Sequence, residues 1–88
     1  MKYFENTEGT FVLFAFVTTK VAGDANAVIE KLYEFEKIAE IYGITGEIDL
    51  LLKLECTNFE ELKDLLNKIR QVPGILMVNS HVVFQKYR

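Results

Sequence analysis

A glycine-rich turn near the middle of the chain, with apolar segments on both sides, constrains the fold more than any other feature. Gly43 and Gly46 lie three residues apart and are followed by Asp49 and an apolar segment that ends at Cys56. Glycine adopts backbone angles that a Cβ would forbid, so this spacing is typical of a β-hairpin turn with a strand leaving it. A second stop and turn, Val-Pro-Gly-Ile at residues 72–75, opens the last apolar segment.

Hydrophobic periodicity predicts four strands and two helices. The strands are expected at residues 10–18, 36–44, 49–56 and 75–85, and the helices at residues 25–35 and from a capping box at residues 57–60 to about residue 71. Asp24 is expected to cap the first helix. The hydroxyl of Thr57 and the side chain of Glu60 are expected to form the capping box. Pro73 prevents the second helix from continuing.

The element order β-α-β-β-α-β predicts a ferredoxin-like domain of the α+β class. Right-handed crossovers then give a four-stranded antiparallel sheet in the order 4-1-3-2, with both helices on one face. A length of 88 residues fits a single domain over residues 1–88, in which residues 1–9 form a polar lead.

The sheet face without helices is expected to be apolar as well. In the first strand, Val12, Phe14 and Phe16 alternate with a second apolar set. The last strand is assigned two apolar faces, with Leu76, Val78, Val82 and Phe84 on one and Ile75, Met77 and Val83 on the other. Leaving a large apolar side chain in water forgoes about 1.5–3 kcal/mol. A second copy of the chain is therefore expected to cover this face, with Phe14 and Phe16 in a sheet-to-sheet homodimer interface.

Composition and motifs argue against several functional classes. Ten Lys and Arg against thirteen Asp and Glu give a net charge of −3, which argues against direct DNA binding. Cys56 is the only cysteine, which favours a reducing cytoplasm, and the apolar run at residues 11–17 is far shorter than the roughly 20 residues of a membrane helix. His81 is the only histidine, and the sequence contains neither a phosphate loop nor a Ser-His-Asp set. We expect no catalytic residues, no metal and no cofactor.

Three segments resemble the C-terminal effector-binding domain of the Lrp/AsnC (feast/famine) transcription regulators, often called the RAM domain. They are residues 41–53, 58–62 and 72–75, and the resemblance extends over about residues 10–84. It implies a βαββαβ domain that dimerises through its sheet and often assembles into rings, commonly octamers or decamers. It also implies that small amino-acid effectors bind between neighbouring dimers, near the hairpin loop.

The chain departs from the family pattern in two ways. Only residues 1–9 precede the first strand, so the resemblance implies a stand-alone domain without the helix-turn-helix and without direct DNA binding. The family often has an aromatic residue where Ile48 stands, and threonines where Val78 and Ser80 stand. Ile48 and Val78 would make the pocket less polar, which favours an aliphatic amino acid.

The predicted ligand-binding residues are Gly46, Ile48, Asp49, Val78 and Ser80. Asp49 could accept a hydrogen bond from a ligand ammonium, and the backbone near Gly46 could approach a ligand carboxylate. Each also has a purely structural interpretation: a turn glycine, a turn-capping carboxylate and a locally bonded strand hydroxyl. The alternative function is a structural partner that co-assembles with full-length Lrp/AsnC regulators without a ligand. An enzyme of the dimeric α/β-barrel type, which shares this fold, is less favoured.

Overall fold

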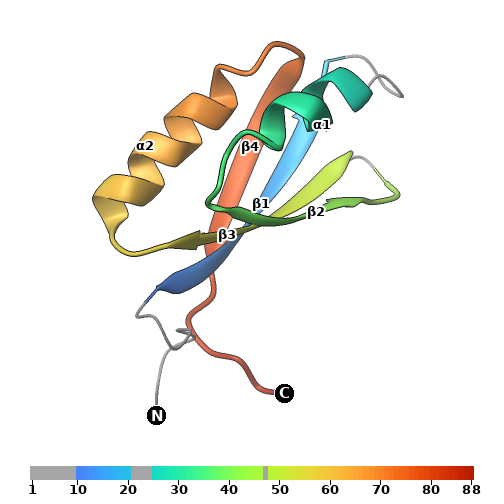
Figure 1. Ribbon diagram of the computed structural model, residues 1–88. Helices are drawn as coiled ribbons and strands as arrows, with labels where there is room; N and C mark the ends of the chain where they lie inside the picture. Colours follow the sequence, from blue (N-terminus) through green and yellow to red (C-terminus); the bar gives the residue numbers. More distant parts are fainter. Residues whose placement is uncertain (1–9, 21–24, 47) are drawn as a thin grey trace.

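Four strands and two helices follow one another in the order β1-α1-β2-β3-α2-β4, as the sequence predicts (Figure 1). The computed structural model describes residues 10–20, 25–46 and 48–88. The elements are β1 (Phe11–Thr19), α1 (Asn26–Leu32), β2 (Ile38–Gly43), β3 (Leu50–Cys56), α2 (Phe59–Arg70) and β4 (Ile75–Val82). The predicted polar lead and the predicted cap Asp24 lie outside the described residues.

The strands form one antiparallel sheet in the order β2-β3-β1-β4, which is the predicted order read from the other edge. In the middle of the sheet, Ala15 of β1 lies opposite Leu52 of β3 on one side and opposite Ser80 of β4 on the other. β1 is therefore the inner strand that connects β4 to the hairpin strands β2 and β3. The predicted ferredoxin-like arrangement is confirmed.

The hydrophobic core lies between this sheet and the two helices. Alternate residues of β1 and β3 face the helices because successive strand side chains point to opposite faces. Their partners come from α1, α2 and the turn before β4. The core is formed by Leu13, Ala15, Val17, Val28, Leu32, Leu50, Leu52, Leu54, Cys56, Leu62, Leu65, Leu66, Ile69, Val72, Ile75 and Val78. Within it, burial raises the pKa of the free Cys56 thiol, as expected for an unreactive cysteine.

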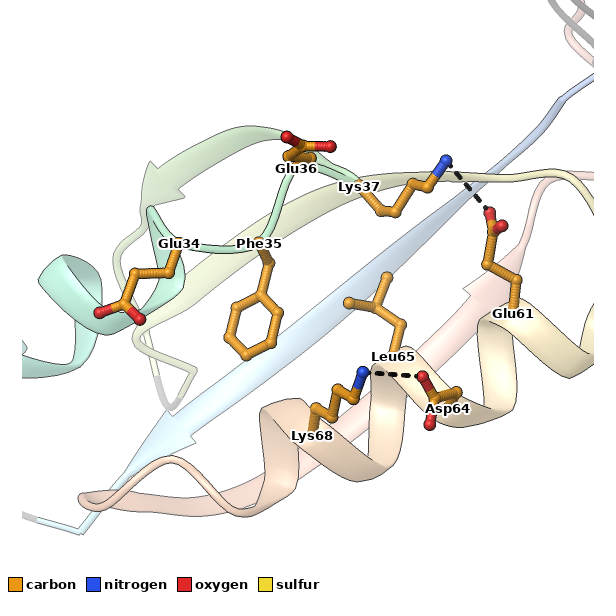
Figure 2. Close-up of a pocket in the computed structure, with 8 residues that line it drawn as sticks. All are labelled: Glu34, Phe35, Glu36, Lys37, Glu61, Asp64, Leu65 and Lys68. Carbon is orange, nitrogen blue, oxygen red and sulfur yellow. Dashed lines mark ion pairs between the residues drawn. The ribbon is translucent and has the colours of Figure 1, made fainter.

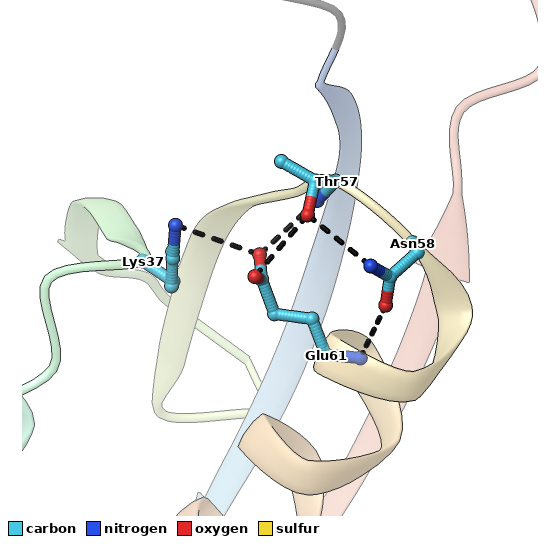
Figure 3. A network of polar contacts seen from close by, with 4 residues as sticks. All are labelled: Lys37, Thr57, Asn58 and Glu61. Carbon is cyan, nitrogen blue, oxygen red and sulfur yellow. Dashed lines mark hydrogen bonds and ion pairs between the residues drawn. The ribbon is translucent and has the colours of Figure 1, made fainter.

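The N-terminus of α2 has a capping box that is displaced by one residue from the predicted one (Figure 3). Asn58 is the N-cap, and its side chain accepts a hydrogen bond of 2.8 Å from the backbone N–H of Glu61. The carboxylate of Glu61 in turn accepts hydrogen bonds from the N–H of Thr57 at 3.1 Å and from its hydroxyl at 3.2 Å. The predicted pairing of Thr57 with Glu60 is wrong because Asn58 remains extended, so the helix begins one residue later.

Helix α1 ends three residues before the predicted boundary. After Leu32, the N–H of Glu34 bonds to the carbonyl of Lys31 and the N–H of Phe35 bonds to the carbonyl of Leu32. These are i→i−3 bonds, which tighten the last turn and lead the chain towards β2. The segment that the sequence assigns to the end of the helix therefore forms the turn between α1 and β2.

A β-bulge at the start of β4 changes the predicted assignment of its faces. Thr18 lies opposite Met77, but Thr19 lies opposite Ile75, so Leu76 is the extra residue. As a result Ile75 packs in the core with 6% of its surface exposed, whereas Leu76 is 62% exposed. The sequence-based placement of Ile75 on the face of Met77 is therefore wrong. Strand β4 also ends at Val82, before the predicted residue 85.

The turn before β4 brings the backbone close to α1. Gly74 has a φ of +98°, and a Cβ at this position would lie 2.9 Å from Cγ2 of Val28. Its carbonyl accepts a hydrogen bond of 2.7 Å from the N–H of Lys20. Both the backbone angle and the close approach therefore require glycine here. In the part of the chain that the structure describes, no helix has the length and hydrophobicity needed to cross a membrane.

Candidate functional site

The carboxylate of Asp49 is held by Thr19 at the end of the sheet where the β2–β3 hairpin turns. The backbone N–H of Thr19 donates to Oδ2 of Asp49 at 2.7 Å, and the Thr19 hydroxyl donates to the same oxygen at 2.9 Å. The N–H of Asp49 donates to the carbonyl of Val17 at 3.0 Å. The hydrogen bond from the Thr19 N–H, followed by that from its hydroxyl, lowers the pKa of Asp49.

The local backbone explains why an acidic side chain is suited to this position. The β1–β3 ladder pairs Val17 with Leu50, which is the first residue of β3. The hairpin loop lies on the N-terminal side of Leu50. There the side chain of Asp49 takes the place of a strand carbonyl as the acceptor for Thr19. Thr19 is buried, so its polar groups need partners within the protein.

The hairpin loop itself is open around Gly46. This glycine has a φ of +107°, and a Cβ added to it would meet no described residue within 4 Å apart from its chain neighbours. Conformation rather than space therefore requires glycine at this position. The loop is closed by a hydrogen bond of 3.1 Å from the N–H of Ile44 to the carbonyl of Asp49. Ile48 is half-buried beside Asp49.

The two predicted site residues of β4 lie on the opposite side of β1 from Asp49. Val78 is opposite Val17, the residue whose carbonyl bonds to Asp49, so both flank the same residue of the central strand. Ser80 is opposite Ala15, two residues further along β1, and is half-buried. Val78 belongs to the core and is buried. The structure thus brings Asp49 and Val78 to the same level of the sheet, and the contact of these residues with a ligand stays a prediction.

The sheet face without helices is more polar than the sequence pattern indicates. Phe14 and Phe16 are half-buried on this face of β1. Phe14 lies between Lys53 of β3 and His81 of β4, and the ring of His81 meets Phe16 edge-on at 5.7 Å. A cavity of about 300 Å³ adjoins Phe14 and is lined by Phe14, Lys53, Val83, Gln85 and Lys86. Apolar and charged side chains therefore share the face on which the homodimer contact is predicted.

A second cavity lies on the helical side, between the turn after α1 and the side of α2 that faces this turn (Figure 2). It measures about 290 Å³ and is lined by Glu34, Phe35, Glu36, Lys37, Glu61, Asp64, Leu65 and Lys68. Ion pairs border it, with 3.5 Å between Lys37 and Glu61 and 3.0 Å between Lys68 and Asp64. The sequence alone gives acidic residues at these positions but no sign of a cavity. The cavity forms because the turn after α1 packs near α2, a tertiary contact that no local pattern reveals.

Metal-ligating side chains do not gather within the described ranges. No three His, Cys, Asp or Glu residues among residues 10–20, 25–46 and 48–88 come together in a way that could hold a metal ion. Three of the acidic side chains around the helical cavity, Glu34, Glu61 and Asp64, instead form ion pairs with lysines.

Comparison with known proteins gives one consistent family. The model of the Lrp/AsnC ligand binding domain matches residues 12–88. The HTH-type transcriptional regulator FL11 of Pyrococcus abyssi is 32% identical over 79 residues, which are 89% of this chain and 52% of that protein. The chain thus spans about half the length of the curated relatives it matches.

Solved structures of the same kind superpose closely on the chain. AsnC of E. coli gives a TM-score of 0.84 at 26% identity and covers 92% of this chain and 56% of its own. FFRP-DM1 gives a TM-score of 0.77 at 31% identity, over 84% of this chain and 99% of its own. The regulator NMB0573 of Neisseria meningitidis, described as a complex with L-Met, gives a TM-score of 0.79 over 89% of this chain and 52% of its own. At 20% sequence identity, this superposition shows a shared fold.

Proposed function

The chain belongs to the Lrp/AsnC ligand-binding domain family, and from this membership we propose that it is a regulatory module that binds a small amino acid at the hairpin end of its sheet. Its homologues are transcription regulators. In this proposal the domain senses the effector and transmits its presence through its own assembly state or through its association with full-length relatives.

The observation that carries the proposal is the arrangement of the Asp49 carboxylate. Both hydrogen bonds from Thr19 end on Oδ2. Among the described residues, Oδ1 takes no hydrogen bond, and the side chain is only half-buried. A carboxylate that stays ionised and keeps one oxygen available is a suitable acceptor for the ammonium group of an amino acid.

The remaining polar and apolar contacts are assigned by the chemistry of an α-amino acid. The backbone of Gly46 can approach a ligand carboxylate, because glycine itself carries no side chain. Ser80 offers a hydroxyl, and Ile48 and Val78 supply apolar surface for an aliphatic side chain. The L-Met complex of the neisserial regulator supports the idea that this fold can accommodate an amino acid of that kind.

Assembly is the second half of the proposal. Phe14 and Phe16 are expected to lie in a homodimer interface formed by two sheets, and the effector is expected to bind where neighbouring dimers meet. The charged residue Lys53 beside Phe14 forms an ion pair with Glu40 at 4.0 Å, which reduces the cost of covering it. Rings of dimers, with eight or ten subunits, are the expected higher state.

The competing proposal is a structural partner that assembles without a ligand. The exposed apolar side chains of Met77 and Val82 on β4 favour association through contacts that need no effector. Both functions predict oligomers, so binding of a small molecule is the property that separates them.

Titration calorimetry with each of the twenty amino acids tests the proposal. We expect at least one aliphatic amino acid to bind. Asp49→Asn keeps the shape and an oxygen for Thr19 but removes the charge, so affinity should fall roughly 10- to 150-fold. Asp64→Asn, at an exposed carboxylate paired with Lys68 on α2, serves as the matched control and should bind like the wild type.

The possible contrary results separate two errors. If none of the twenty binds to protein that circular dichroism shows to be folded, the sensing function is overturned in favour of the structural one. If an amino acid binds and Asp49→Asn retains wild-type affinity, the domain is a sensor but the role given to Asp49 is wrong.

A further inference from the structure

Thr19 is the residue that fixes the orientation of the Asp49 carboxylate, although thirty positions separate the two in the sequence. Its N–H and its hydroxyl reach the same oxygen at 2.7 and 2.9 Å. Thr19 has only 6% of its surface exposed and lies in β1, an inner strand of the sheet. Two donors from one buried residue therefore connect a rigid element to a side chain at the mouth of the hairpin.

The bulge in the β1–β4 pairing occurs at this residue. The register changes between Thr18 and Thr19, so that Thr18 faces Met77 but Thr19 faces Ile75 in the core. A bulge increases local twist and redirects side chains, and such irregularities are common next to functional sites. Thr18, one residue earlier, keeps the regular register and is half-buried.

We propose that Thr19 is a positioning residue of the effector site, which holds Asp49 so that Oδ1 is presented to the ammonium group of the ligand. The inference rests on the proposed function. A carboxylate held by two hydrogen bonds on one oxygen loses most of its rotational freedom, and the ligand then need not supply the ordering entropy. Supporting partners of this kind commonly change affinity without touching the ligand.

The hydroxyl can be removed with little change in volume. Thr19→Val keeps the branched shape and the backbone N–H bond but loses the hydroxyl bond, whereas Thr19→Ser keeps both donors. Thr18→Val makes the same chemical change one residue away and is the matched control. If Thr19→Val does not fold, Thr19→Ala removes the same hydroxyl at a smaller side chain.

Two measurements test the inference. The first is a ¹³C NMR titration of the Asp49 carboxyl carbon in the ligand-free protein, in which Thr19→Val should raise the pKa of Asp49 only part of the way, since the backbone bond remains. The second is calorimetry with each of the twenty amino acids. We expect Thr19→Val to lower the affinity for the bound amino acid roughly 3- to 10-fold, and Thr19→Ser and Thr18→Val to bind like the wild type.

The outcomes distinguish this inference from the function it rests on. If Asp49→Asn weakens binding but Thr19→Val does not, the inference is overturned and the proposed function stands. If Thr19→Ser binds as weakly as Thr19→Val, a packing effect explains the loss of affinity and the inference is likewise overturned. If Asp49→Asn binds like the wild type, or if no amino acid binds, the proposed function fails and the inference falls with it.

Discussion

Lys37, one residue before β2, and Glu61, in the first turn of α2, form an ion pair with 3.5 Å between Nζ and Oε1 (Figure 3). The same carboxylate accepts two hydrogen bonds from Thr57. A solvent-exposed ion pair contributes little to stability, whereas the bonds to Thr57 complete the cap of a helix. Glu61 is therefore expected to matter more for stability than Lys37.

Replacement of Glu61 should reveal this difference in its pH dependence. The hydrogen bond from the Thr57 N–H is the largest cause that lowers the pKa of Glu61 from 4.5, and Lys37 contributes less. A lowered pKa in the folded state stabilises the protein above pH 4.5, and this stabilisation is lost as the pH falls through the folded-state pKa. Glu61→Gln should thus lower the melting temperature at pH 7, and the gap to the wild type should narrow as the pH falls below 4.5.

Melting curves from pH 3 to 8 measure this effect. Lys37→Met is the comparison, and its effect at pH 7 should be smaller than that of Glu61→Gln. A constant gap between Glu61→Gln and the wild type across the whole range would contradict the assigned cap.

The position of the capping box can be tested independently. Asn58→Ala removes the acceptor for the Glu61 N–H and should destabilise the protein by about 1 kcal/mol in urea denaturation. Asn67→Ala, an exposed residue of the same helix, should be neutral or slightly stabilising because alanine is the better helix former. Equal losses from both variants would mean that the Asn58 cap does not form.

The close approach of Gly74 to Val28 predicts a specific interaction between two mutations. Gly74→Ala should cost about 1–3 kcal/mol, since the residue has a positive φ and the new methyl group would lie 2.9 Å from Cγ2 of Val28. Gly46 has a similar φ but no such contact, so Gly46→Ala measures the free-energy cost of the positive φ alone. In the Val28→Ala background the cost of Gly74→Ala should shrink, and a double-mutant cycle by urea denaturation measures the coupling.

The proposed dimer interface predicts a change in assembly. Phe16→Glu would place a charge at the centre of the face without helices and should yield monomers, or prevent folding if the monomer is unstable. Phe14→Glu should act in the same way. Leu76→Glu is the matched control, because this residue is the extra residue of the bulge and is exposed.

Sedimentation velocity at about micromolar concentration reports the result. The Leu76→Glu variant should sediment like the wild type. A wild-type protein that sediments as a folded monomer would refute the interface.

The sequence predicts the element order and the sheet topology because both depend on patterns that recur along the chain. The hairpin at Gly43 and Gly46 and the turn at Gly74 are local signals, and they separate apolar segments of strand length from segments with helical spacing. The errors occur where the outcome depends on a single residue of register. Helix α2 begins after Asn58 rather than after Thr57, and the bulge at Leu76 directs the side chain of Ile75 into the core. Neither shift changes the hydrophobic pattern enough to be visible in advance.

The candidate site is predicted in part. Asp49 follows from its place between a glycine turn and an apolar strand. Thr19 was missed because its contact with Asp49 depends on how β1 pairs with β3. The signal exists in principle: the pairing of Val17 with Leu50 places Asp49, the residue before Leu50, at the end of β1 that carries Thr19. Deriving it requires the register, which the sequence pattern does not fix to one residue.

Helix α1 has seven residues, its N-cap Ala25 has no side-chain acceptor, and Val28 packs against the backbone of Gly74. Isolated helices of this length are unstable in water, so α1 acquires its structure only when the turn before β4 is in place. Local opening should therefore begin at α1, while the twelve-residue α2 with its capping box opens later. In hydrogen exchange, the amides of α1 should therefore lose their protection before those of α2.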